Sequence, residues 1–140
     1  MIYKLSKGSL LHSEGVDSRL IRVRDYAIQR TIIDFGIPKF GGKRTVEDQQ
    51  WLFSRVPSIT QIDGTNDISD HQTGFALDFF PYVRGKVSYK IAHCALVVAA
   101  FLEGGSRLGI QLGWGGFWGG GPYVEGFTDM PHIYIPKKYR

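Results

Sequence analysis

The chain has 140 residues, of which 43% are hydrophobic and 14% aromatic, and its formal net charge is +4. This length and composition exclude a disordered chain and predict one globular domain, residues 1–140, with a core that needs no disulfides. The single cysteine, Cys94, excludes an intramolecular disulfide. It lies in an apolar segment, where we expect a core thiol and not a nucleophile.

The sequence shows no signal peptide and no run of about 18 apolar residues. We therefore expect synthesis in the cytoplasm and no stable insertion into a membrane. The basic residues are scattered and no nucleic-acid motif accompanies them, so we expect no nucleic-acid partner.

The first predicted element is a helix that Asp17 caps and that runs to about Phe35, where Gly36 ends it. Thr45 and Asp48 form a capping box that predicts a second helix through about Arg55. A long polar loop from Ser58 to Asp70 follows and leads to His71.

Alternating side chains predict a strand from Phe75 to Phe80, closed by Pro81, with Asp78 on the opposite face from Leu77. The remaining elements are a turn at Arg84-Gly85, a helix from Ser88 to Leu102 before Gly104-Gly105, and strands over Gly109–Trp114 and Pro131–Pro136. The predicted fold is α+β, a small antiparallel sheet packed against about three helices.

Two short segments hold the residues that suggest chemistry. The segment Ser69–Asp78 and the segment Asp129–His132 together supply two imidazoles, a carboxylate ligand and a second carboxylate that could activate water. A catalytic zinc ion needs about three such ligands and one open position. Asp78 lies within an apolar strand, where a carboxylate is costly unless it meets a metal or a cation. The inventory predicts a zinc hydrolase with its metal site in a cleft.

Three blocks of sequence resemble the M15-family zinc peptidoglycan peptidases, a family that includes D-alanyl-D-alanine carboxypeptidases and L-alanyl-D-glutamate endopeptidases. The central block has the pattern Ser-x-His-x-x-Gly-x-Ala-x-Asp over residues 69–78, carried by Ser69, His71, Gly74, Ala76 and Asp78. The upstream block, residues 42–53, is similar to the family's Arg-Thr-x-x-x-Gln-x-x-Leu segment. The third, Trp114-Gly-Gly-x-Trp118 followed by Asp129-x-Pro-His132, resembles the endopeptidase branch that includes phage endolysins.

The resemblance implies a role for each matching residue. His71, Asp78 and His132 would hold zinc, and Asp129 would be the general base that takes a proton from water and returns it to the leaving amine. Arg44 would anchor or polarise the substrate carbonyl. Two further candidates for substrate contact are Ser69 and Trp114. The sequence departs from the branch at Tyr134, where an acidic residue is common, and in the extension from Pro122 to Thr128.

The implied function is cleavage of the L-Ala-D-Glu bond of the peptidoglycan stem peptide by a single catalytic peptidase domain. A chain of this kind resembles a monomeric phage endolysin, which would stay in the host cytoplasm before release and act in the periplasm on the cell wall. Two alternatives remain open from the sequence. One is a D-Ala-D-Ala carboxypeptidase of the same fold, and the other is a non-catalytic, zinc-stabilised wall-binding module.

Overall fold

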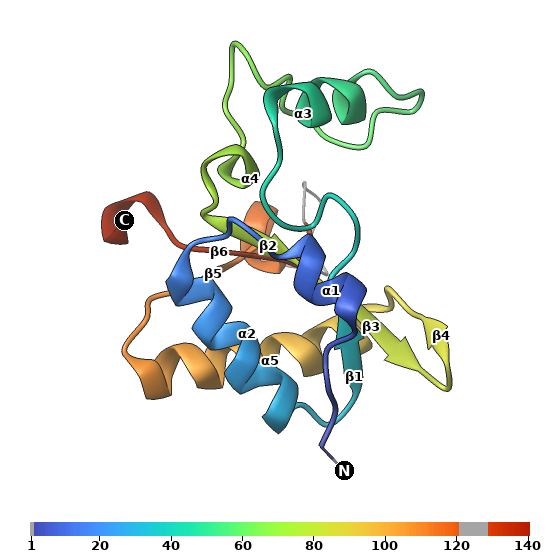
Figure 1. Ribbon diagram of the computed structural model, residues 1–140, viewed down its shortest axis with the longest axis vertical. Helices are drawn as coiled ribbons and strands as arrows, with labels where there is room; N and C mark the ends of the chain where they lie inside the picture. Colours follow the sequence, from blue (N-terminus) through green and yellow to red (C-terminus); the bar gives the residue numbers. More distant parts are fainter. Residues whose placement is uncertain (1, 121–128) are drawn as a thin grey trace.

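The computed structural model describes residues 2–120 and 129–140, so the extension from Pro122 to Thr128 lies outside the described residues. Figure 1 shows the order of the elements. The helices are α1 (Lys7–His12), α2 (Ser18–Arg30), α3 (Val46–Phe53), α4 (Asp70–Thr73) and α5 (Ile91–Leu108), and 3-10 turns span Gly115–Gly120 and Lys137–Tyr139. The strands are β1 (Asp34–Gly36), β2 (Ala76–Asp78), β3 (Phe80–Val83), β4 (Lys86–Val87), β5 (Gly113–Trp114) and β6 (His132–Tyr134).

The strands form two small antiparallel sheets, in the orders β1-β3-β4 and β2-β6-β5. The helices α2 and α5 pack against each other on one side, while α3 and α4 lie at the opposite end of the molecule (Figure 1). The predicted α+β class is confirmed. The expectation of one sheet and about three helices is wrong in detail, because the described residues form two sheets and five α-helices.

The single strand predicted from Phe75 to Phe80 is two strands that belong to different sheets. The chain changes sheets at Phe79, whose side chain is fully buried and whose N–H donates to the carbonyl oxygen of Pro131 at 3.0 Å. Pro81 does not close a strand, since it lies within β3 opposite Phe35. The two neighbours of Phe79 belong to the ladders of different sheets. A single alternating pattern therefore does not describe this segment.

The helix predicted to end at Phe35 ends at Arg30. Asp17 caps α2 as expected and accepts a hydrogen bond from the backbone of Arg19 at 2.9 Å. Thr31 is already extended, and its hydroxyl donates to the carbonyl of Ile33 at 2.6 Å. Three consecutive β-branched residues from position 31 favour extended backbone, so the chain leaves the helix and enters β1.

The glycines at positions 104 and 105 lie inside α5 and do not end it. A side chain on Gly104 would come within 2.9 Å of the Tyr26 ring, and one on Gly105 within 2.8 Å of the carbonyl of Ile110. Both glycines therefore permit close packing within the helix. The helix ends at Gly109, which has a φ of 69°.

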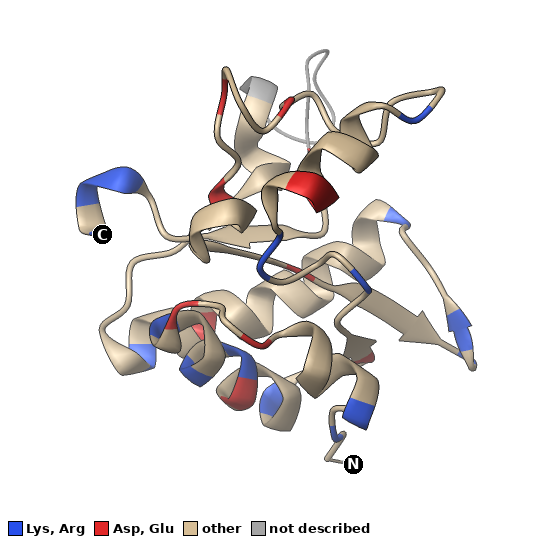
Figure 2. Ribbon diagram, turned by 45° about the horizontal axis from the view of Figure 1, so that its top comes forward, with Lys and Arg blue, Asp and Glu red and all other residues tan. Residues whose placement is uncertain are grey.

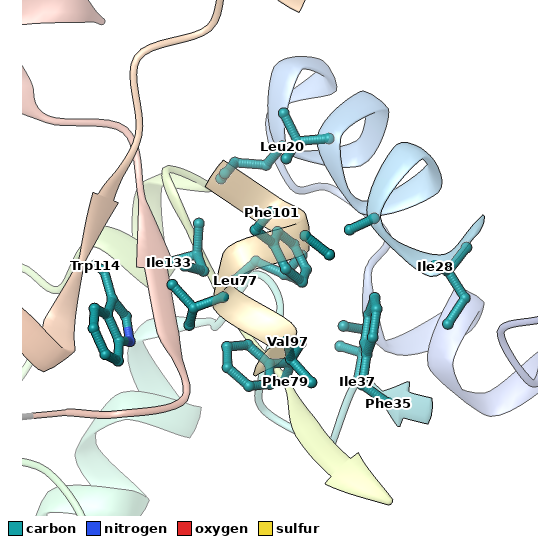
Figure 3. Close-up of a cluster of buried hydrophobic side chains, with 14 of the residues drawn as sticks. Leu20, Ile28, Phe35, Ile37, Leu77, Phe79, Val97, Phe101, Trp114 and Ile133 are labelled. Atoms are coloured by element: carbon teal, nitrogen blue, oxygen red, sulfur yellow. The ribbon is translucent and has the colours of Figure 1, made fainter. Parts of the chain in front are cut away.

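Helix α5 is long and apolar enough to cross a membrane by length and composition alone, and it is the one such helix among the described residues. Its buried side chains Cys94, Val97 and Phe101 pack into the core, where Figure 3 shows Phe101 close to Leu77. A core helix meets the same criteria as a membrane span, and the packing of α5 identifies it as a core helix. The expectation that Cys94 is a core thiol is confirmed.

Candidate metal centre

The site is assembled where α4 meets the β2-β6-β5 sheet. Asp78 ends β2 and His132 begins β6, and the two residues are cross-strand partners. His71 lies on α4 and not in a loop as the sequence predicted. Ser69 makes this short helix possible, because its hydroxyl caps the backbone of His71 and its own N–H bonds the side chain of Gln72 in a capping box.

Three donor atoms converge at this point. Nε2 of His71 lies 3.3 Å from Nδ1 of His132, and Oδ1 of Asp78 lies 3.3 Å from the first and 2.9 Å from the second. These are the side chains that the sequence predicted as metal ligands, and the structure brings all three together. They form the group among the described residues that could hold a metal ion.

Two consecutive glycines, which the sequence analysis did not single out as site residues, orient two of the three donors. The carbonyl of Gly42 lies 2.9 Å from Nδ1 of His71, and the carbonyl of Gly41 accepts the backbone N–H of Asp78 at 2.7 Å. With Nδ1 donating to Gly42, Nε2 of His71 is the nitrogen that faces the cluster. A Cβ at Gly42 would lie 2.0 Å from the carbonyl oxygen of His12, so the position requires glycine. The sequence signal for these two backbone contacts was the Gly-Gly pair just before Arg44.

Arg44 packs partly buried against the same cluster, with 11% of its side chain exposed. Its guanidinium donates to the carbonyl of Phe40 at 2.8 Å and to the side chain of Gln49 at 3.0 Å, and it lies 3.4 Å from Oδ2 of Asp78. The arginine thus binds Oδ2 of Asp78, the carboxylate oxygen that faces away from the histidines. Oδ1 remains directed toward the two imidazoles.

Asp129 lies at the edge of the cluster, with Oδ2 at 3.8 Å from Nδ1 of His132. Its backbone N–H donates to Gly115 at 3.0 Å, which fixes the segment that leads into β6. Its side chain is partly exposed, unlike the buried ligand cluster. Burial and the negative charge of Asp78 raise the pKa of Asp129 above its ordinary value.

The charges within the cluster shift the other groups in opposite directions. Burial works against ionisation of Asp78, but the charges and hydrogen bonds of His71 and His132 lower the pKa of this carboxyl. Burial also opposes protonation of His132, yet the hydrogen bond and charge of Asp78 raise the pKa of this imidazole. Burial lowers the pKa of Arg44, against the charges of Asp78 and Asp129.

The two residues expected to contact substrate have structural contacts instead of open surface. Ser69 is buried and caps α4. Trp114 is buried beside Ile133 in the core (Figure 3), and its indole N–H donates to the carbonyl of Met130 at 2.7 Å. Their contact with a substrate stays a prediction. Tyr134 replaces the acidic residue common in the branch, and its hydroxyl accepts the indole N–H of Trp118 at 3.1 Å.

The donor set and its spacing fit a tetrahedral zinc ion. Ligands at about 2.0–2.1 Å from such an ion lie about 3.3 Å apart. The three donor separations in this cluster are 2.9, 3.3 and 3.3 Å. Two imidazoles and one carboxylate with a fourth position open are a donor set of catalytic zinc sites.

Comparisons with known proteins give one consistent result. Residues 1–135 match the family model described as phage L-alanyl-D-glutamate peptidase. The chain is 31% identical over 141 residues to the L-alanyl-D-glutamate peptidase of Escherichia phage T5, covering 96% of this chain and 99% of that protein. It also resembles the crystal structure of the Serratia marcescens L-Ala D-Glu endopeptidase ChiX, with a TM-score of 0.76, 24% identity, and coverage of 96% of this chain and 92% of that one.

Proposed function

Since this chain belongs to the phage L-alanyl-D-glutamate peptidase family, we propose that it is a zinc-dependent endolysin that hydrolyses the L-Ala-D-Glu bond of peptidoglycan stem peptides. Family membership supports the peptidase activity and the bond. The observation that carries the metal is the convergence of His71, Asp78 and His132, whose donor atoms lie 2.9–3.3 Å apart. The family match spans residues 1–135, which supports treating the chain as one catalytic domain.

His71, Asp78 and His132 would hold the zinc ion, with their other polar atoms restrained by Gly42, Arg44 and the β2-β6 pairing. When bound, zinc supplies Lewis acidity, which makes water a nucleophile at neutral pH and polarises a carbonyl oxygen.

Asp129 would act as the general base. Its partly exposed carboxylate lies next to the cluster. Its pKa is raised toward the pH at which the enzyme would work, as a group that accepts and then donates a proton requires. As the water oxygen adds to the L-Ala carbonyl carbon, Asp129 takes the proton. It then returns that proton to the nitrogen of D-Glu as the C–N bond breaks.

Arg44 would hold Asp78 in place, and the guanidinium contact to Oδ2 supports this role directly. We keep stabilisation of the oxyanion as a second role for the same side chain, since one cation near the reacting carbonyl would favour the developing negative charge. The three hydrogen bonds of the guanidinium to Phe40, Gln49 and Asp78 show how firmly it is anchored.

The biological setting follows from the substrate. An endolysin of this kind would be made in the host cytoplasm, pass the inner membrane at lysis, and act as a monomer on the periplasmic wall without inserting into the membrane. Figure 2 shows Lys and Arg on α2, on the β3-β4 hairpin and on the C-terminal segment. The formal charge of +4 would attract the protein to a wall that carries stem-peptide carboxylates. Binding to sacculi should therefore weaken at high salt.

The test is mass spectrometry of purified peptidoglycan digested with the protein, with and without a zinc chelator. New amino termini at D-Glu that disappear on chelation are the expected result. Release of free D-alanine would replace the proposal with a carboxypeptidase. Absence of any product, with the metal bound, would replace it with a wall-binding module.

A further inference from the structure

Two aromatic rings, Phe40 and Trp51, pack against each other near the segment that supports the metal cluster. Their centroids are 5.7 Å apart with an interplanar angle of 38°. The ammonium group of Lys39 lies 5.2 Å from the Phe40 centroid, and the guanidinium of Arg55 lies 4.3 Å from the Trp51 centroid. Trp51 is 47% exposed, an unusual position for a large indole ring. We call these two rings the aromatic platform.

The backbone is strained at one end of the platform. Phe40 has a φ of 65°, in the left-handed region that a bulky side chain rarely occupies. It is the third residue of a turn closed by a hydrogen bond from the N–H of Gly41 to the carbonyl of Pro38 at 2.9 Å, a position that ordinarily takes glycine or asparagine. A strained residue that glycine could replace points to a use for its side chain.

The helix face around Trp51 carries hydrogen-bonding groups on both sides of the ring. Glu47 lies one turn before Trp51 on α3 and Arg55 lies four residues after it, just beyond the helix end. Side chains four residues apart share one face of a helix. The guanidinium of Arg55 lies over the indole ring and its Nε–H donates to the carbonyl oxygen of Trp51 at 3.3 Å, while Glu47 occupies the position one turn earlier.

The platform is joined to the metal cluster through Arg44. The carbonyl of Phe40 accepts the Nε–H of Arg44, and the same guanidinium reaches Oδ2 of Asp78. Gly41 and Gly42, the next two residues after Phe40, support Asp78 and His71. The platform and the metal cluster are therefore neighbours, linked through the backbone of Phe40 and the side chain of Arg44.

We infer that the platform binds a pyranose ring of the glycan chain to which the stem peptide is attached, an inference that rests on the proposed function. In peptidoglycan the L-Ala residue is joined to the sugar through a lactyl group. The scissile carbonyl and the sugar ring are thus separated by about two residue lengths, roughly 7 Å. An enzyme that cuts after L-Ala in intact peptidoglycan therefore works with a sugar close to its reacting atoms.

The chemistry of the face favours a sugar over other occupants. A pyranose has an apolar face of C–H bonds for an aromatic ring and hydroxyl groups at its rim for a carboxylate and a guanidinium. The face carries both signs of charge, Glu47 and Asp48 near Lys39 and Arg55, which suits the hydroxyl groups of a sugar better than a uniformly anionic membrane. The contact of Arg55 with Trp51 is an exposed cation–aromatic contact, which is weak enough for a ligand to displace.

The experiment compares two substrates that differ only in the sugar. One is the disaccharide-tetrapeptide, and the other is the same tetrapeptide with an N-lactoyl cap in place of the disaccharide. For Trp51→Ala we expect kcat/KM on the disaccharide substrate to fall roughly three- to tenfold, mainly through KM, with less than a twofold change on the lactoyl peptide. Trp51→Phe should recover most of the loss. The control is Tyr139→Ala, since Tyr139 is 44% exposed beneath Lys138 and lies at the C-terminal end, away from α3 (Figure 1).

A binding measurement separates this inference from the proposed function. The peptide-free disaccharide is titrated into the wild-type protein and Trp51→Ala, and the heat of binding is followed by calorimetry. Saturable binding to the wild type that Trp51→Ala abolishes would support the platform. This holds even if the protein cleaves neither substrate, because absence of cleavage would refute only the proposed function. Equal losses on both substrates, no loss on either, or Trp51-dependent binding to anionic phospholipid vesicles in place of the disaccharide would overturn it.

Discussion

Asp78 and His132 are directly opposite each other in the β2-β6 ladder, and this single pairing places a carboxylate oxygen 2.9 Å from an imidazole nitrogen. Strand register therefore places two of the three residues of the cluster. A slip of one residue would turn one of the two side chains to the other face of the sheet. The third residue of the cluster, His71, comes from helix α4, and the carbonyl of Gly42 in another segment holds its ring.

The ligand set predicts metal content. His71→Ala should lose the bound metal after dialysis, because two remaining ligands do not make a stable zinc site. His93→Ala is the matched control, since His93 pairs with Ser88 at 2.6 Å and lies outside the cluster. Elemental analysis of the dialysed proteins should give one zinc per chain for the wild type and the control. Retention of zinc by His71→Ala would remove this residue from the ligand set.

Substitution of Asp129 should separate catalysis from metal binding. We expect Asp129→Ala to keep its zinc and to lose roughly 10²–10⁴-fold in kcat, the usual contribution of a general base. Product formation from purified peptidoglycan and zinc content are measured on the same sample. Turnover at the wild-type rate would exclude Asp129 as the base, whereas loss of zinc would make it a ligand.

Gly42→Ala should weaken the metal site from a distance. The new Cβ would meet the carbonyl of His12, so the segment must shift and carry the acceptor of His71 with it. Overpacking of this kind costs about 1–3 kcal/mol in the free energy of unfolding. The free energy of unfolding, measured by chemical denaturation, and the zinc affinity should both fall. Gly8→Ala, whose Cβ would meet no atom closer than 3.8 Å and which lies in helix α1, should lower neither. Unchanged zinc affinity in Gly42→Ala would show that this carbonyl does not orient the histidine.

The cap of α2 predicts a pH-dependent stability difference. The side-chain hydrogen bond from Arg19 outweighs burial and lowers the pKa of Asp17 below its ordinary value. A depressed pKa in the folded state gives stability that is present above the unfolded pKa and lost as the pH falls through the folded one. Asp17→Ala should cost about 0.5–2 kcal/mol at pH 7. In urea titrations this difference should shrink below about pH 4, and a difference that stays constant to pH 2 would contradict the assignment.

The thiol of Cys94 should be unreactive in the folded protein. Burial raises its pKa to about 11, and the side chain is fully enclosed by the core. At pH 8 only about one thiol in a thousand is then ionised, and the thiolate is the reactive form. A chromogenic disulfide reagent should label the native protein far more slowly than the protein in denaturant. Rapid labelling of the native protein would place Cys94 at an accessible surface.

The three residues that meet in the cluster could be predicted from the sequence because their identity and spacing carry the chemistry. His71, Asp78 and His132 meet as expected, and the capping residues Asp17 and Thr45 begin their helices as expected. These features depend on residues close together in sequence or on side chains with few alternative uses.

The supporting structure could not be predicted in the same way, because it depends on tertiary contacts. No local pattern shows that the chain changes sheets at Phe79, since this residue is apolar and fits either reading. From the sequence alone, Gly104 predicts the end of a helix. The structure shows that the ring of Tyr26 packs against this position, which explains the glycine inside the helix. Arg44 reads as a substrate contact, and only the fold shows that its nearest acidic partner is Asp78.

The ligands of the cluster are far apart along the chain: His71 and His132 are separated by 61 residues, and Asp78 and His132 by 54. An unfolded chain cannot hold them together without a large loss of loop entropy, so it binds metal weakly. The free energy of binding the proposed zinc ion then adds to the free energy of folding. The resistance of this small protein to heat and proteases should therefore follow the free zinc concentration of the compartment in which it works.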